Sequence, residues 1–137
     1  MSIGHVLEFH EKFDLPNASQ DLLMGDAAAQ EFRVKFLQEE LDELKEALGQ
    51  GDRVKAFDAL LDLVYVAYGT ALFAGIAPDQ WCTGMLVVHA CNMAKVRVAK
   101  AEDSKRDSAF DVRKPAGWVG PEAQLEKILS WDERGWA

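Results

Sequence analysis

Helical spacing of apolar residues runs through most of this sequence, and no other feature restricts the fold as strongly. Across residues 53–74, apolar side chains recur at positions i, i+3, i+4 and i+7, which is the pattern of one face of an α-helix. Stretches that alternate apolar and polar residues, as strands do, are nearly absent. The sequence therefore predicts an all-α protein.

Cap and turn residues divide the helical pattern into four to five helices. The expected helices follow a Ser2 cap up to Asp14 and then cover residues 26–48, 52–74, 78–100 and a short stretch after Pro121. Only Gly49-Gln-Gly51 separates the second helix from the third, so we expect these two to form an antiparallel hairpin.

Length and composition fit one domain. With 137 residues and a hydrophobic fraction of 49%, the chain can bury a core without disulfides. We therefore expect a single domain over residues 1–137, with a loop at 101–120 and a C-terminal helix and tail at 121–137, where Trp131 and Trp136 are candidate anchors. Cys82 and Cys91 form no CxxC pair and are interpreted as reduced, small core residues.

The acidic balance of the chain restricts its partners. A net charge of −8, from 15 basic and 23 acidic residues, disfavours binding to nucleic acid or to an anionic membrane. The N-terminus has no basic start, and the longest apolar run, residues 60–77, contains Asp62 and two glycines. We expect a cytoplasmic protein with no membrane span and no nucleic-acid partner, and metal cations are the more natural ligands.

Acids and large apolar residues share one side of the expected 26–48 helix. On a wheel of about 100° per residue, one arc holds Glu39, Glu40, Glu43, Phe32, Phe36 and Ala47. A neighbouring stripe holds the leucines at 37, 41, 44 and 48. Phenylalanines are unusual within a solvated acidic face, so some of these carboxylates should point into the helix packing. The next helix adds Asp58 and Asp62, four positions apart on its edge.

Five carboxylates on one hairpin favour a bound cation. Without one, they would repel each other and raise each other's pKa values. An all-oxygen ligand set suits Mg²⁺, for which Mn²⁺ can substitute, and argues against zinc. The alternative is an ordinary charged helix face in which Lys45 pairs with neighbouring acids. Composition and periodicity leave both interpretations open.

Four short motifs follow one another along the chain: Glu39-Glu40-Leu-Asp-Glu43, Asp58-Ala-Leu-Leu-Asp62, Asn92-Met-Ala-Lys95 and Lys114-Pro-Ala-Gly-Trp118. Together with Arg33 and Phe36 ahead of the first, they resemble the MazG-like and phosphoribosyl-ATP pyrophosphohydrolase superfamily, over roughly residues 9–121. One departure concerns the ExxD pattern common in that superfamily. Ala59 stands three positions before Asp62, and the second acid is Asp58 instead.

The resemblance implies a Mg²⁺-dependent hydrolase of phosphoric anhydride bonds. Such an enzyme cuts a (d)NTP between its α- and β-phosphates into monophosphate and pyrophosphate, a reaction that serves nucleotide-pool cleaning. The implied metal ligands are Glu39, Glu40, Glu43 and Asp62, with Asp58 as either a ligand or a supporting residue. Glu39 or Glu40 is expected to orient or deprotonate the attacking water.

Substrate contacts are expected from six residues: Asn92, Lys95, Lys114, Trp118, Arg33 and His10. Lys95 follows Asn92 by one helical step, so the lysine can reach phosphate while the amide reads the sugar or base. Lys114 and Trp118 are placed to close over a nucleotide. The alternatives are a surface lysine for Lys95 and a packing role for Trp118.

The broad apolar faces of the middle helices exceed what one short bundle can cover. We therefore expect the helical bundle to be completed by homo-oligomerisation, as a homodimer or homotetramer, with active sites near the subunit contact. Two other functions remain open. One is phosphoribosyl-ATP hydrolysis, which uses the same acids, and the other is a non-catalytic helical interaction module in which the acids are surface charge.

Overall fold

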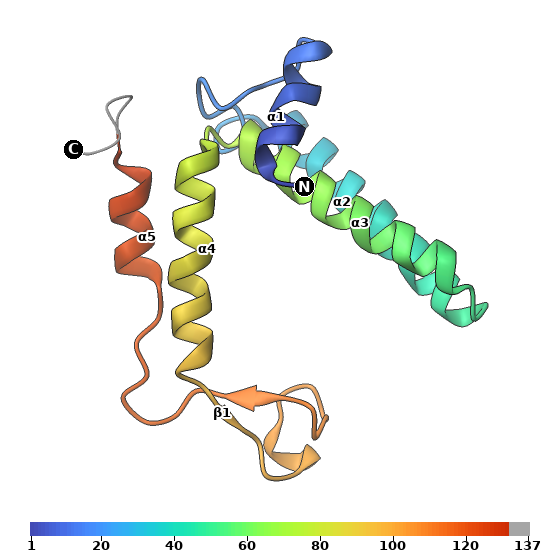
Figure 1. The fold of residues 1–137 in the computed structure, drawn as a ribbon, viewed down its shortest axis with the longest axis vertical. Coiled ribbons are helices and arrows are strands. Elements are labelled where there is room, and N and C mark those ends of the chain that lie inside the picture. Colours follow the sequence, from blue (N-terminus) through green and yellow to red (C-terminus); the bar gives the residue numbers. More distant parts are fainter. Residues whose placement is uncertain (132–137) are drawn as a thin grey trace. The chain divides into compact units, whose positions relative to one another are not determined.

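The computed structural model describes residues 1–131, which divide into two compact units, residues 1–81 and residues 82–131. The described residues contain five α-helices, a short 3₁₀-helix and one two-stranded sheet (Figure 1). The predicted all-α class is confirmed, and within residues 1–131 a small two-stranded sheet accompanies the helices. That the whole chain forms a single domain stays a prediction.

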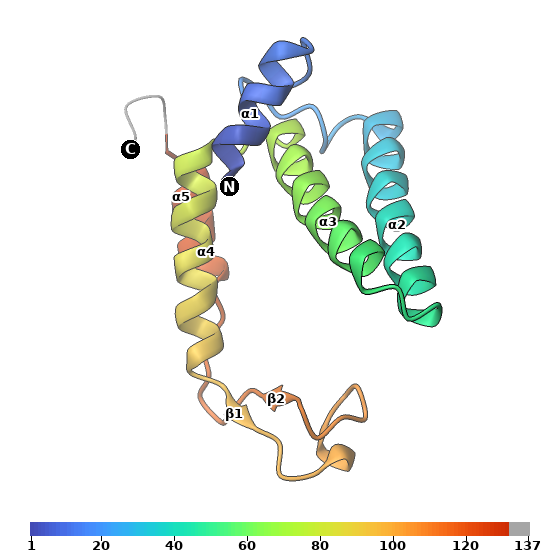
Figure 2. The same cartoon turned by 45° about the vertical axis from the view of Figure 1, so that its right-hand side comes forward.

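An antiparallel helical hairpin dominates the first unit. It consists of α2 (Ala27–Gly49) and α3 (Arg53–Phe73), which run side by side (Figure 2). The Asp26 side chain accepts hydrogen bonds from two N–H groups of the first turn of α2, and the Asp52 side chain caps α3 in the same way. Gly51, with φ +67°, makes the tight turn between the helices that a glycine allows without strain. The hairpin was predicted, with its two helices starting at about Asp26 and at Asp52.

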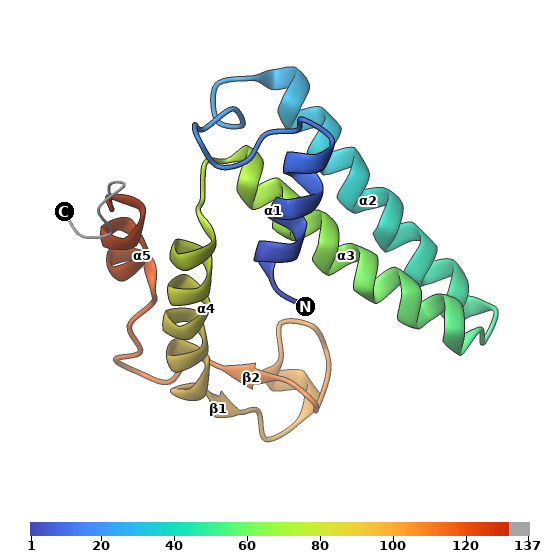
Figure 3. The ribbon, with the colours of Figure 1, turned by 45° about the horizontal axis from the view of Figure 1, so that its top comes forward.

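The first helix covers one end of this hairpin. α1 (Ile3–Lys12) lies against α3 (Figure 3), and a small core forms there from Ile3, Val6, Ala71 and Leu72. The segment after α1 returns to the end of α3, where the N–H groups of residues 18 and 22 donate to the last carbonyls of that helix. These bonds satisfy groups that a helix end otherwise leaves unpaired.

The hairpin packs through small residues and leaves many of its large ones outside. Ala56, Ala59 and Gly69 of α3 are buried against the rest of the unit, whereas Phe57 is 64% exposed. Leu48, in the predicted leucine stripe of α2, is 65% exposed. Small side chains let two helices approach closely, and the apolar residues that remain form an exposed face of this unit.

The fourth helix is shorter than predicted. α4 (Pro78–Met93) ends before the expected boundary near residue 100, because β1 (Val96–Arg97) pairs with β2 (Val112–Arg113) in an antiparallel register that sets Val96 opposite Arg113. Between the strands lies the 3₁₀-helix η1 (Ala101–Asp103). Pairing between distant segments overrides local helical preference here, so the predicted helix over 94–100 is wrong.

The last helix, α5 (Glu122–Leu129), starts after Pro121 as predicted and returns alongside α4, where a Cβ on Gly84 would lie 3.4 Å from Leu125 Cδ2 (Figure 1). Trp131 is half-buried, and Trp136 lies outside the described residues. Both cysteines are free, but Cys82 is exposed, which corrects its prediction as a core residue.

Among the described residues, α3 alone is long and apolar enough to cross a membrane, with a mean hydropathy of 1.4 over its most apolar stretch. The core helix of a soluble protein meets the same criterion. In this structure α3 is the helix against which both α1 and α2 pack.

Candidate metal centre

Three carboxylates converge between α2 and α3. Glu40 and Glu43 come from α2 and Asp62 comes from α3, and one oxygen of each lies within 4.8 Å of the other two. A hard cation binds carboxylate oxygens at about 2.0–2.6 Å, so two ligands of one ion are separated by at most about twice that distance. The three side chains therefore have the spacing that a single ion requires, and all three were predicted ligands.

Glu40 is the buried member of this cluster. Its side chain is 8% exposed, and its Oε2 is buried without a hydrogen-bond partner. Burial raises the pKa of Glu40 above its ordinary value of 4.5, and the negative charges of Glu43, Asp62 and Glu39 raise it further. A buried carboxylate oxygen that accepts no hydrogen bond is costly, and a cation bound among the acids removes that cost.

Two further acids flank the cluster. Burial raises the pKa of Asp62, and the charge of Asp58 adds to that increase. Glu39 and Asp58 are both exposed and lie outside the three-carboxylate group, so metal ligation by these two stays a prediction. The ion pairs found within residues 1–131 involve none of the five acids. The alternative of a charged face neutralised by Lys45 therefore finds no support in the described residues.

Arg33 sets the register between the two helices that carry these acids. It is 5% exposed, its Nε donates to Thr70 Oγ1 at 3.1 Å, and its Nη2 donates to the Val66 carbonyl at 2.9 Å. The guanidinium also lies 4.7 Å from the ring centroid of Phe73. Residues 33 and 40 are two helical turns apart on the same face of α2. Fixing Arg33 against α3 therefore also fixes Glu40 opposite Asp62.

Gly69 makes room for this contact. A Cβ at this position would lie 2.7 Å from Arg33 Nη2 and 3.0 Å from His10 Nε2. His10 is itself buried, and its Nδ1 hydrogen-bonds to the Pro16 carbonyl. Both side chains are buried and hydrogen-bonded to neighbouring residues, and contact of Arg33 and His10 with substrate stays a prediction.

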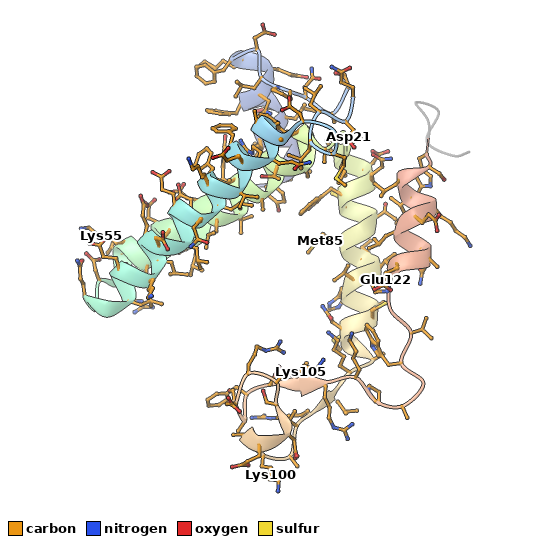
Figure 4. The ribbon with its side chains drawn as sticks, turned by 180° about the vertical axis from the view of Figure 1, so that it is seen from behind. Asp21, Lys55, Met85, Lys100, Lys105 and Glu122 are labelled. Carbon is orange, nitrogen blue, oxygen red and sulfur yellow. The ribbon has the colours of Figure 1, made fainter. Side chains whose placement is uncertain are left out.

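The acids border an open space near the turn of the hairpin. A pocket of about 320 Å³ is lined by Glu43, Glu46, Ala47, Gln50, Lys55 and Asp58, and Figure 4 shows Lys55 at this end of the hairpin. Its volume falls within the range of small-ligand pockets, about 300–1,000 Å³. Glu43 thus belongs both to the carboxylate cluster and to the wall of the pocket.

Other predicted substrate residues meet in the second unit. Trp118 Nε1 donates to the Cys91 carbonyl at 2.8 Å. Lys95 Nζ and Lys114 Nζ lie 5.4 and 4.8 Å from the centroid of the Trp118 ring. Asn92 is exposed near the end of α4. The structure brings the two lysines and the tryptophan together, and their contact with substrate stays a prediction.

Sequence reasoning missed the basic residues around β2, notably Lys105 and Arg113, which line a pocket together with Lys95 and Lys114. Their signal was present in the sequence, because residues 95–114 hold seven of the 15 basic residues of this acidic chain: Lys95, Arg97, Lys100, Lys105, Arg106, Arg113 and Lys114.

Comparison with known proteins found similarity mainly in the first unit. The family model described as phosphoribosyl-ATP pyrophosphohydrolase matches residues 6–85, which is more than half of the chain and includes all five acids of the hairpin. The matched range ends before Asn92. The search of curated proteins found no significant match.

Proposed function

The chain belongs to the phosphoribosyl-ATP pyrophosphohydrolase family, and from this premise we propose that it hydrolyses a (d)NTP to monophosphate and pyrophosphate, with Mg²⁺ as its metal. Family membership supports the broader statement that the protein is a nucleotide pyrophosphohydrolase, a hydrolase of phosphoric anhydride bonds. The non-catalytic interaction module is therefore set aside. Beyond this broader activity, we propose the identity of the substrate and of the metal.

The observation that carries the proposal is the buried, unpartnered Oε2 of Glu40 within a group of three carboxylates. The group contains only oxygen ligands, which suits Mg²⁺ or Mn²⁺ better than zinc. In this assignment Glu40, Glu43 and Asp62 hold the ion. Mg²⁺ bound there supplies Lewis-acid polarisation and neutralises phosphate charge.

The remaining chemistry falls to carboxylates of α2. Water attacks the α-phosphorus, the bond from that phosphorus to the α,β-bridging oxygen breaks, and pyrophosphate leaves. Glu39 is exposed and adjacent to Glu40, and its charge acts on Glu40. In this proposal one of these two carboxylates orients the water and accepts its proton. Oxygen from water must then appear in the monophosphate product.

Hydrolysis in ¹⁸O-labelled water tests this reaction. We expect common (d)NTPs, incubated with the protein and Mg²⁺, to give ¹⁸O-labelled monophosphate and unlabelled pyrophosphate, and Glu40→Gln to abolish turnover. Asp42→Asn is the matched control, because Asp42 is an exposed acid of α2 outside the cluster. Label in pyrophosphate, or release of diphosphate and orthophosphate, would contradict the proposal.

Phosphoribosyl-ATP is the second candidate substrate, and the description of the matched family favours it. Both substrates present a bond between α- and β-phosphates to the same acids. The lysines and the tryptophan of the second unit lie outside the matched range, and we take them as support for (d)NTP. Preferential turnover of phosphoribosyl-ATP over every (d)NTP, in a direct competition, would reverse this order.

We also propose that the protein works as a homodimer or homotetramer in the cytoplasm, without a membrane or nucleic-acid partner. The exposed large residues of α3, Phe57, Leu60, Leu61 and Val64, support an oligomer because such apolar surface is usually covered. The net charge of −8 disfavours binding to polyanionic surfaces such as nucleic acid or an anionic membrane. A stable monomer in sedimentation at micromolar concentration would contradict the oligomer.

A further inference from the structure

The second unit contains a pocket whose walls are mainly basic. Its volume is about 400 Å³, and it is lined by Lys95, Asp103, Lys105, Arg106, Asp111, Val112, Arg113 and Lys114. The eight residues lie on the two strands, on the segment that joins them, and at the positions just before β1 and just after β2. Lys105 is on this joining segment, together with Lys100 (Figure 4). The pocket is therefore complete within one unit.

One of its two acids is already neutralised. Asp111 forms an ion pair with Arg106 and accepts a hydrogen bond from Ser104 Oγ at 2.7 Å and another from the Val112 N–H at 2.8 Å. These three contacts lower the pKa of Asp111 to about 2. Arg106 and Asp111 thus offset each other and organise the segment between the strands.

The other charges around the pocket are unbalanced. Lys95, Lys105, Arg113 and Lys114 form no ion pair with the described residues, and Asp103 is the one remaining acid. Four cations against one anion leave an excess of three positive charges. This excess stands out in a chain of net charge −8, because the rest of the molecule does not attract anions.

The sheet holds two of these cations close together. Val96 pairs with Arg113, so Lys95, just before β1, and Lys114, just after β2, are neighbours across the ladder. Both ammonium groups then approach the ring of Trp118, which is anchored to the Cys91 carbonyl. The aromatic face stabilises each cation modestly but does not neutralise it. A multiply charged anion bound between the two lysines would neutralise them.

We propose that this pocket binds the polyphosphate group of a nucleotide or free pyrophosphate, with Lys95, Lys105, Arg113 and Lys114 as its cations. Three excess positive charges match a di- or triphosphate better than a singly charged anion, and a guanidinium such as that of Arg113 presents paired N–H donors to phosphate oxygens. The role of the pocket in turnover rests on the proposed function. The ability of the pocket to bind polyphosphate does not depend on that function.

Calorimetry with inorganic pyrophosphate and tripolyphosphate tests the pocket directly. The protein is titrated in EDTA, so that metal at the carboxylate cluster plays no part. We expect binding that weakens as salt is raised and that falls about tenfold or more in the double variant Lys105→Gln with Arg113→Gln. Lys127→Gln, on α5 and outside the pocket, is the matched control and should bind like the unchanged protein.

Trp118, whose ring contacts Lys95 and Lys114 of the pocket, supplies a second readout. Pyrophosphate that approaches Lys95 and Lys114 should change tryptophan fluorescence, and the change should disappear in Trp118→Phe while the other three tryptophans stay in place. No binding of either polyphosphate in EDTA would overturn the proposal. Unchanged affinity in the double variant, or equal affinity for orthophosphate or an oligonucleotide, would also overturn it.

Two further measurements distinguish failure of this inference from failure of the proposed function. Glu40→Gln should bind pyrophosphate in EDTA as the unchanged protein does, and loss of that binding would contradict an independent pocket. Absence of (d)NTP turnover with intact pyrophosphate binding would refute the proposed function alone. In kinetics, the double variant raises the nucleotide KM if the pocket holds the substrate, and weakens inhibition by pyrophosphate alone if it holds the free product.

Discussion

Gly69→Ala tests whether a close approach of Arg33 builds the metal centre. In the middle of a helix, alanine in place of glycine normally stabilises by about 0.5–1 kcal/mol, because glycine loses more backbone entropy on folding. Here the added Cβ would lie 2.7 Å from Arg33 Nη2 and 3.0 Å from His10 Nε2. The guanidinium can move away only by giving up its bond to the Val66 carbonyl and its place beside Phe73.

The cost of that movement outweighs the gain. Forcing an extra methyl into a packed site costs about 1–3 kcal/mol, and a hydrogen bond from a charged group contributes about 1.5–3 kcal/mol. The two costs together are about 2.5–6 kcal/mol, and subtracting the helical gain of about 1 kcal/mol leaves a net loss of stability of about 1.5–5 kcal/mol. Gly49→Ala is the control, because a Cβ at Gly49, the last residue of α2, has no atom within 4 Å. That variant should be neutral or slightly more stable.

Urea unfolding of both variants in EDTA gives the two free-energy changes, and a metal titration of the folded proteins gives the functional consequence. We expect Gly69→Ala to unfold at lower urea and to bind Mg²⁺ more weakly, because Glu40 shifts relative to Asp62. A Gly69→Ala protein as stable as the unchanged one would refute the packing argument. Lower stability with unchanged metal affinity would refute the link between Arg33 and the carboxylates.

Three further predictions concern the same hairpin. Because the pKa values of Glu40 and Asp62 are raised in the folded protein, the stability that these two groups contribute to the metal-free protein should be complete below their ordinary values of 4.5 and 3.8 and be lost as pH rises through the raised values. Urea midpoints in EDTA across this range should show a shallower loss for Glu40→Gln, and an equal slope would contradict the raised pKa of Glu40. Arg33→Met, which keeps apolar bulk and loses the bonds to Val66 and Thr70, should lower the free energy of unfolding by about 1–3 kcal/mol and weaken Mg²⁺ binding. Leu60→Asp, at a half-exposed position of α3, should lower the mass measured by sedimentation without unfolding the helices seen by circular dichroism, and an unchanged mass would move the subunit contact elsewhere.

The hairpin and its acids were predictable because their signals are local. Asp26 and Asp52 mark helix starts through hydrogen bonds within the first turn. The mixture of acids and phenylalanines on one arc of α2 indicated carboxylates turned into the packing, and Glu40 is the acid of α2 that is buried. The period of 3.6 residues places Glu40 and Glu43 on one face, whatever the rest of the chain does.

The second unit was less predictable because its contacts are not local. Val96 and Arg113 form a ladder pair across a segment with no strand pattern of its own, so α4 was predicted too long. The position of Arg33 depends on a glycine and a carbonyl of another helix. Nothing in the spacing around Arg33 distinguishes such a buried cation from one that faces substrate.

The central claim is that Glu40, Glu43 and Asp62 form one divalent-metal site, and a calorimetric Mg²⁺ titration of the substrate-free protein tests it most directly. We expect saturable binding to the unchanged protein and to Asp42→Asn, and a loss of affinity of tenfold or more in Glu40→Gln and in Asp62→Asn. No binding to the unchanged protein, or equal binding to all four proteins, would contradict the claim.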